Sequence, residues 1–311
     1  MTTPEMPTRT FVARAPVDVL ALVPVVLGFE PEDSVVMLTF GSEHQFQARL
    51  DLPPPGATDA EVAAVSALLV EPAVHHRVSR VLLVLYSHDA HAARRSARSL
   101  VDAFGAAGIE VLETIRAHGS RHWPAIGPGT GTPYDVSAHP LRAQAVLDGR
   151  VTHRSRDELA ASLDPDPGRR AEVARVLART PALAADEVSA LLSDCLATGR
   201  EPGPVELAGL LQALVDPRVR DVAWLSMTRA DAVLHVDLWS QVVRRTPDER
   251  LPGAAAVLGF AAWLSGSGAL AWCAVDRCLA VDPDHVLGGY VAQLLERAVP
   301  PGAWAPAGRP A

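Results

Sequence analysis

Four histidines lie just after two predicted strands, where imidazoles can bind a metal. They are His88, His91, His118 and His122. The first two follow the apolar run 81–85, and the other two follow the run 109–115. If these strands are neighbours, the imidazoles and Asp89 converge on one edge of a sheet, a ligand set that suits a divalent transition metal. The alternative is that they are solvated loop residues, with Asp89 capping the next helix, since the spacings match no compact ligand motif.

The same edge could instead receive an anion. Arg94 and Arg95 fall in the first turns of the helix predicted after Asp89, and Arg121 lies on the neighbouring loop. Guanidinium groups beside free helix N-terminal amides can bind phosphate or carboxylate. The alternative is that these arginines are surface charges, because all 28 basic residues are arginine. The residues expected to bind a ligand here are Ser87, His88, Asp89, Arg94, Arg121, His122, Trp123 and Tyr134.

Several catalytic classes are excluded or disfavoured. The chain has no lysine, which excludes a phosphate-loop lysine, a Schiff-base lysine and a lysine general base. The glycine-rich stretch 127–131 follows no clear strand and opens no helix, so we interpret it as a mobile or lid-like part of a long loop, 121–133. Ser87 precedes His88, but neighbours on a strand point apart, and no Gly-x-Ser-x-Gly elbow occurs.

The elements that position these residues form an α/β sheet domain. The unbroken apolar run 81–85 is typical of a strand covered on both faces. A helical pattern follows it, and then the strand 109–115, so the two strands should run in parallel as a crossover unit. Upstream, strands 35–40 and 44–50 flank a glycine turn and predict a β-hairpin. The acidic residues Glu30, Glu32 and Asp33 precede this hairpin.

The second half of the chain has helical periodicity throughout. Two Asp-Pro steps within 163–168 indicate a boundary. We therefore predict an α/β domain at 10–150, a linker and helix at 151–168, and an all-α domain at 169–300. The complete prediction is an N-terminal three-layer sheet with mixed strands, a β-hairpin plus a parallel βαβ unit, followed by an all-α domain.

One pair of helices in that domain has the spacing of a tetratricopeptide hairpin. Gly259 and Ala271 lie where small residues let two helices cross closely, and Pro283 lies where proline ends the second helix. No clear second copy occurs. The pair is therefore either a tetratricopeptide-like groove for a peptide or a tight antiparallel helix pair.

Composition limits partners and compartment. The net charge is −8 and the basic residues are scattered, which argues against nucleic acid. No apolar run reaches the roughly 18 residues of a membrane span, and the first 14 residues lack the apolar core of a signal peptide, so we expect a cytoplasmic protein without a membrane partner. The odd cysteine count within apolar patterns predicts three small buried side chains, Cys195, Cys273 and Cys278.

Several segments resemble the actinobacterial domain-of-unknown-function family 4192. The opening segment 20–36 carries the resemblance, together with Gly131-Thr-Pro-Tyr-Asp135, the step at 155–159 and the helix pair that ends at Asp282-Pro283. The resemblance implies an actinobacterial, cytosolic protein. Family members often carry cysteines between the tryptophan and the Gly-Thr-Pro-Tyr-Asp step, but the interval 124–130 has none here. A metal or redox role for such cysteines therefore does not carry over.

We expect a noncatalytic or regulatory binding protein, because no complete set of nucleophile, base and orienting group is visible. Its α/β domain would bind a ligand, and its helical domain would bind a protein partner that the sequence does not identify. One alternative is a metal- or phosphate-dependent hydrolase acting at the sheet edge. Its cofactor would be a divalent metal, and the sequence indicates no other cofactor. Another is a self-assembling structural protein, that is, a homo-oligomer.

Overall fold

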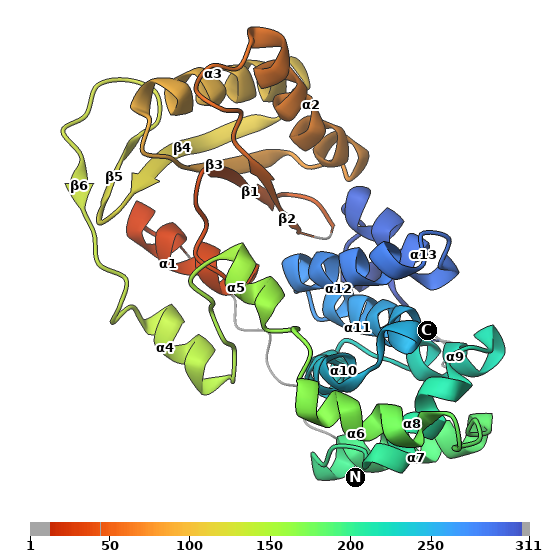
Figure 1. Cartoon of the computed structure of the whole chain (residues 1–311). Helices are drawn as coiled ribbons and strands as arrows, with labels where there is room; N and C mark the ends of the chain where they lie inside the picture. The colour runs from red at the N-terminus through yellow and green to blue at the C-terminus, as the bar shows by residue number, and fades with distance from the viewer. Residues whose placement is uncertain (1–12, 44, 307–311) are drawn as a thin grey trace.

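The computed structural model describes residues 13–43 and 45–306 and contains a six-stranded mixed sheet followed by packed helices (Figure 1). The strands lie in the order β2-β1-β3-β4-β5-β6. Their bounds are β1 Ser34–Phe40, β2 Gln47–Asp51, β3 Arg80–Tyr86, β4 Glu110–His118, β5 Arg121–Pro124 and β6 Thr132–Pro133. The expected start of the second hairpin strand, His44, lies outside the described residues, as do residues 10–12 of the predicted first domain.

Strand β3 lies in the interior of the sheet, as its apolar run predicts. On one side it pairs antiparallel with β1, with Ser34 opposite Tyr86. On the other side it pairs parallel with β4, with Tyr86 opposite Ala117, and helix α3 (Ala90–Ala106) joins the two strands. The carboxyl ends of β3 and β4 and the first residue of β1 therefore share one end of the sheet, which we name the rim.

Alternate residues of β3 face two different cores because side chains alternate across a strand. The odd-numbered apolar residues pack with α2 (Asp59–His75) and α3, whereas the even-numbered ones belong to a cluster that includes α1 (Pro16–Leu27). Figure 1 shows α2 and α3 across one face of the sheet, with α1 and α5 (Arg156–Ala161) across the other. The N-terminal half thus has the predicted three layers.

Local signals fix where several of these helices begin and end. Thr58 and Glu61 form a reciprocal capping box at the start of α2, with the Thr58 amide donating to the Glu61 carboxylate at 2.6 Å. Helix α1 ends at Gly28, whose φ of 80° is left-handed.

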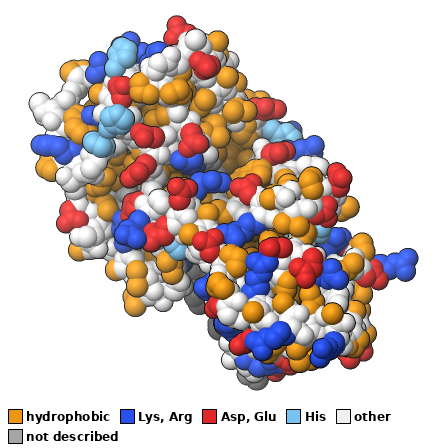
Figure 2. All heavy atoms as spheres, in the orientation of Figure 1, with side chains coloured by type: hydrophobic (Ala, Val, Ile, Leu, Met, Phe, Trp, Pro, Cys, Tyr) orange, Lys and Arg blue, Asp and Glu red, His pale blue; other side chains and the backbone are white. Residues whose placement is uncertain are grey.

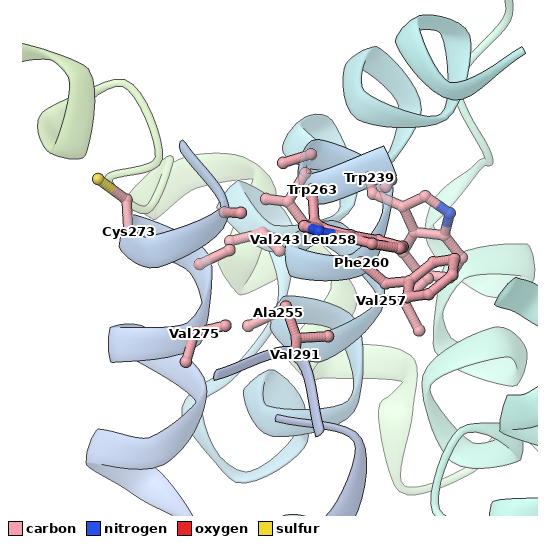
Figure 3. Close-up of a cluster of buried hydrophobic side chains, with 14 of the residues drawn as sticks. Trp239, Val243, Ala255, Val257, Leu258, Phe260, Trp263, Cys273, Val275 and Val291 are labelled. Atoms are coloured by element: carbon pink, nitrogen blue, oxygen red, sulfur yellow. The ribbon is translucent and has the colours of Figure 1, made fainter. Parts of the chain in front are cut away.

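Helices make up the rest of the chain. Their bounds are α4 Pro140–Leu147, α6 Pro167–Leu177, α7 Ala185–Thr198, α8 Pro204–Ala213, α9 Pro217–Leu225, α10 Ala232–Arg245, α11 Leu251–Leu264, α12 Gly268–Val281 and α13 Val286–Glu296, with short 3-10 turns at Asp248–Arg250 and Pro301–Ala303. Every residue from 254 to 264 is buried, so α11 is the central helix. Figure 3 shows Trp239 and Val243 of α10 and Val275 of α12 packed beside it.

The two halves share one hydrophobic core. A single cluster of buried side chains runs from the α1 face of the sheet into the helices. Helix α5 makes the junction with α12, where the Arg277 guanidinium donates to the Ala160 carbonyl at 2.9 Å and pairs with Asp164 at 2.6 Å. The predicted linker at 151–168 thus lies within a continuous core.

One prediction about the sheet is wrong. The segment 121–133 is not a plain loop, because β5 forms an antiparallel hairpin with β4 and β6 adds a short final strand. Gly119, with φ 56°, lies in the tight turn between β4 and β5. The proline and glycine content of the segment concealed this hairpin.

Candidate functional site

The two histidine-bearing segments meet at the rim, and an acidic residue joins them. The ring centroids of His88 and His118 are 6.2 Å apart. His88 Nδ1 lies 3.6 Å from Asp33 Oδ1, because the antiparallel pairing of β1 brings the start of that strand to the end of β3. The His88 and Asp33 side chains are 68% and 72% exposed, so their contact adds little to stability.

The other two histidines do not complete a metal centre. The hairpin register places His122 opposite Ala117 and His118 opposite Arg121, and adjacent pairs point to opposite faces of a sheet. His91 is exposed in the first turn of α3. Within residues 13–43 and 45–306, no group of three or more His, Cys, Asp or Glu side chains could hold a metal ion. The four imidazoles proposed as ligands are thus not gathered into one site.

Asp89 and Ser87 organise the backbone at the end of β3. One Asp89 carboxylate oxygen accepts from the amides of His91 at 2.8 Å and Ala92 at 3.0 Å, so Asp89 caps α3. The Ala92 amide and then the His91 amide lower the pKa of this carboxyl group. The Ser87 hydroxyl accepts from the Asp89 amide at 3.1 Å. These contacts occupy the helix N-terminal amides that an anion would need.

A cation that we did not predict lies at the rim. The Arg116 guanidinium carbon stands 3.9 Å from the ring centroid of Trp123, and its Nη1 donates to the Ser87 carbonyl at 3.2 Å. Partial burial and then nearby Arg94 lower the pKa of Arg116. Arg121 is exposed on the hairpin. The positive charge nearest Trp123 is thus Arg116, and the cross-strand pair of residues 116 and 123 is the signal that identifies it.

Arg95, the second arginine of the α3 start, does not point to the rim. Its Nη2 donates to the carbonyl of Ala57, before α2, at 2.5 Å. Figure 2 shows acidic side chains and arginines interspersed over one face of the molecule. No extended region of positive charge marks that face.

Two buried residues beneath the rim carry hydroxyl groups without a hydrogen-bond partner. Tyr86 and Ser34 are opposite one another in the β1–β3 register and so point to the same face of the sheet. Tyr86 is 9% exposed and Ser34 is fully buried, and neither hydroxyl oxygen has a hydrogen-bond partner. Burial, followed by Tyr134 and Glu30, raises the pKa of Tyr86 well above its ordinary value.

One ion pair and one hydrogen bond hold the segment after β6 beside these hydroxyls. Arg142 Nη2 lies 2.5 Å from Glu30 Oε1. His139 Nε2 lies 3.1 Å from Asp18 Oδ1, whose pKa is lowered first by the Arg14 amide and then by His139. The segment 134–142 is thereby fixed to α1 and to the residues before β1.

The comparison with known families gives one match, which spans residues 16–302. The chain belongs to the family described as Domain of unknown function (DUF4192). The resemblance that the sequence motifs indicate is therefore confirmed over most of the chain. No curated protein and no solved structure matches it. Among the described residues, no helix is long and apolar enough to cross a membrane.

In this DUF4192 protein, two of the motifs that carry the family resemblance meet at the rim. The opening motif supplies Glu30 and Asp33. The Gly-Thr-Pro-Tyr-Asp motif supplies Tyr134, whose ring centroid is 5.9 Å from that of His122. Gly131 has φ 77°, and a Cβ there would lie 2.4 Å from Trp123 Nε1, so only glycine fits against the indole. The motif residues thus position the aromatic groups of the rim.

Proposed function

We propose that this DUF4192 protein is a noncatalytic or regulatory binding protein whose sheet binds a small ligand at the rim and whose helices contact a protein partner. The observation that carries the first part is the pair of buried, unpartnered hydroxyls on Ser34 and Tyr86. An unsatisfied buried polar group costs about 1–3 kcal/mol, which a ligand bonded to both hydroxyls would offset. The ligand would be a small neutral molecule rich in hydroxyl or amide groups, because Glu30 and Arg142 neutralise each other nearby.

The contacts of Ser87 support a binding role over a catalytic one. A serine nucleophile needs a base within hydrogen-bond reach. The Ser87 hydroxyl instead contacts the backbone of Asp89, and the Asp89 carboxylate accepts from helix amides. Both groups therefore serve the geometry of the strand end.

For the helical half, we propose that α11 and α12 form a tetratricopeptide-like hairpin that belongs to a protein-interaction surface. Their close approach supports this proposal, since a Cβ at Gly259 would lie 3.2 Å from Val275 and 3.6 Å from the Ala271 carbonyl. Because α11 is buried on every side, a partner would contact the outer helix α12, where Val281 is 46% exposed.

The rim proposal is tested by thermal unfolding of the full chain with a panel of nucleosides, monosaccharides and polyols. We expect at least one compound to raise the melting temperature of the wild type and to lose that effect in Tyr86→Phe. Without ligand, Tyr86→Phe should unfold at the same temperature or slightly higher, because the hydroxyl has no partner to lose. The control Tyr290→Phe, whose ring is 40% exposed, should respond like the wild type. A panel without any shift would contradict the proposal.

A hydrolase that depends on a metal or a phosphate group is the second candidate, and the approach of His88, His118 and Asp33 favours it. Elemental analysis of the purified protein and a thermal-shift panel of nucleotides and phosphoesters separate the two functions. Stoichiometric metal or a large shift with a phosphoester would favour the hydrolase. Neither result is expected of the binding protein.

Self-assembly is the third candidate, and exposed apolar side chains in the helical half favour it. They include Val205, Val215, Val233, Leu234 and Val286. Light scattering over a range of concentrations is the test, and a monomer at every concentration would count against a homo-oligomer.

A further inference from the structure

A cavity of about 340 Å³ lies in the helical half, far along the chain from the rim. It is bounded by α8, α9, the start of α11 and the turn that joins α12 to α13. Its apolar wall includes Leu211, Leu214 and Pro252, and Val215 and Val286 stand exposed among its lining residues. A cavity of this size suits a small metabolite.

One side of the cavity presents a buried guanidinium group. Arg220, on α9, is only 7% exposed. Its Nε is buried without a hydrogen-bond partner, and its Nη2 reaches Asp221 Oδ1 at 3.3 Å. Burying a charge is unfavourable unless strong hydrogen bonds compensate it. Arg220 therefore retains donor capacity for an anionic group.

His285 offers a further donor beside Arg220. Its Nδ1 accepts from the Gly288 amide at 3.1 Å at the start of α13, so the neutral ring carries its proton on Nε2. Burial and then the charge of Arg220 lower the pKa of His285 and keep the ring neutral. By contrast, the Arg250 guanidinium already has an acceptor, since its Nη2 and Nε donate to Gln212 Oε1 at 2.9 and 3.1 Å.

Three carboxylates line the same cavity, those of Glu249, Asp282 and Asp284. In the part of the chain that the structure describes, the only carboxylate within 4.0 Å of the Arg220 guanidinium is Asp221. The cavity is thus lined by groups of opposite charge that do not pair with one another. An anion alone would face three carboxylates, and a cation alone would face two arginines. These acids also form no metal site within the described residues.

We propose that this cavity binds a zwitterionic α-amino acid with an apolar side chain. The ligand carboxylate accepts from Arg220 and from His285 Nε2. The ammonium group lies toward Asp282 and its acidic neighbours, and the apolar side chain packs against Leu211 and Leu214. One ligand thereby compensates the buried guanidinium, pairs with the carboxylates and covers the apolar wall.

Isothermal titration calorimetry of the full chain tests the ligand chemistry. The probes are L-leucine, L-valine, L-methionine and L-phenylalanine, and we expect at least one to bind at a single site. For L-leucine, two matched analogues each remove one charge: L-leucinamide lacks the carboxylate, and 4-methylpentanoate lacks the ammonium group. Each analogue should bind at least about tenfold more weakly than the parent amino acid. Absence of binding by all four amino acids, or equal binding of 4-methylpentanoate, would overturn the proposal.

Variants of the lining residues then locate the site. Arg220→Gln and Asp282→Asn should each weaken amino-acid binding by at least about tenfold. The matched control is Arg218→Gln, an exposed arginine on the same helix, and it should bind like the wild type. If Arg220→Gln fails to fold, Asp282→Asn still decides the question. Tyr86→Phe should also bind normally, so that failure of this site is distinguishable from failure of the rim. Unchanged binding in a folded Arg220→Gln or in Asp282→Asn would overturn the assignment.

Discussion

Each of the three cysteine side chains is buried in the helical half and none forms a disulfide. Burial raises the pKa of Cys195 and Cys273, and it raises the pKa of Cys278 to about 12. Because the thiolate is the reactive form, all three should be inert in the native protein. We expect Ellman's reagent to modify none of them until the chain is unfolded, and then to modify all three. Immediate titration of any thiol in the native state would contradict this expectation.

For single residues, the residue type alone predicted some structural roles and left others unpredicted. Free cysteines in apolar helical patterns are usually buried, so their burial could be predicted. The capping role of Asp89 was one of two open interpretations, and its contacts with the α3 amides decide for it. Arg116 could not be singled out among 28 arginines, since its position depends on Trp123 across a hairpin that the sequence did not reveal.

Helix α3 provides a test of the cap at the element scale. Replacing Asp89 by alanine removes the acceptor of two helix amides, and we expect the melting temperature to fall by roughly 2–4 °C. The pKa of this carboxyl group is lowered in the fold, chiefly by the Ala92 amide. The stabilisation is therefore present above the ordinary carboxyl pKa and is lost as the pH falls through the folded value. Thermal unfolding at neutral and acidic pH should show the gap between wild type and variant closing in acid.

The control for that test is Asp102→Ala, an exposed acidic residue of the same helix. It should leave the melting temperature unchanged at both pH values. If the melting temperature falls equally in the two variants, the loss of a negative charge, and not the loss of the cap, is responsible.

Strand pairing explains why the sheet was only partly predictable. The apolar run of β3 and the helix after it identify the parallel pair, because both signals are local in sequence. The antiparallel pairing of β1 with β3 is not local, and it alone carries Asp33 and Ser34 to the rim. The sequence therefore predicted that His88 and His118 lie at the rim, but it did not predict Asp33 there or the buried hydroxyls of Ser34 and Tyr86.

For the whole molecule, the buried residues form one cluster that spans the two halves of the chain, together with a second cluster under α2 and α3. The change from sheet to helices near residue 163 was visible in the Asp-Pro steps, but packing between α5 and α12 depends on tertiary contacts such as Arg277 with Asp164. The actinobacterial source and the cytoplasmic location stay predictions.

A shared core predicts cooperative unfolding of both halves. Leu163 follows α5 at the junction, is 1% exposed and belongs to the cluster that spans them. Leu163→Ala should lower the free energy of unfolding by about 2–5 kcal/mol because it leaves a cavity in a packed interior. Calorimetry should show one transition, shifted as a whole, in which tryptophan fluorescence and helical circular dichroism change together. The matched control Leu68→Ala, at a leucine that is 59% exposed on α2, should shift it little. Two resolved transitions, with one at the wild-type temperature, would instead mean that the halves are separate folding units.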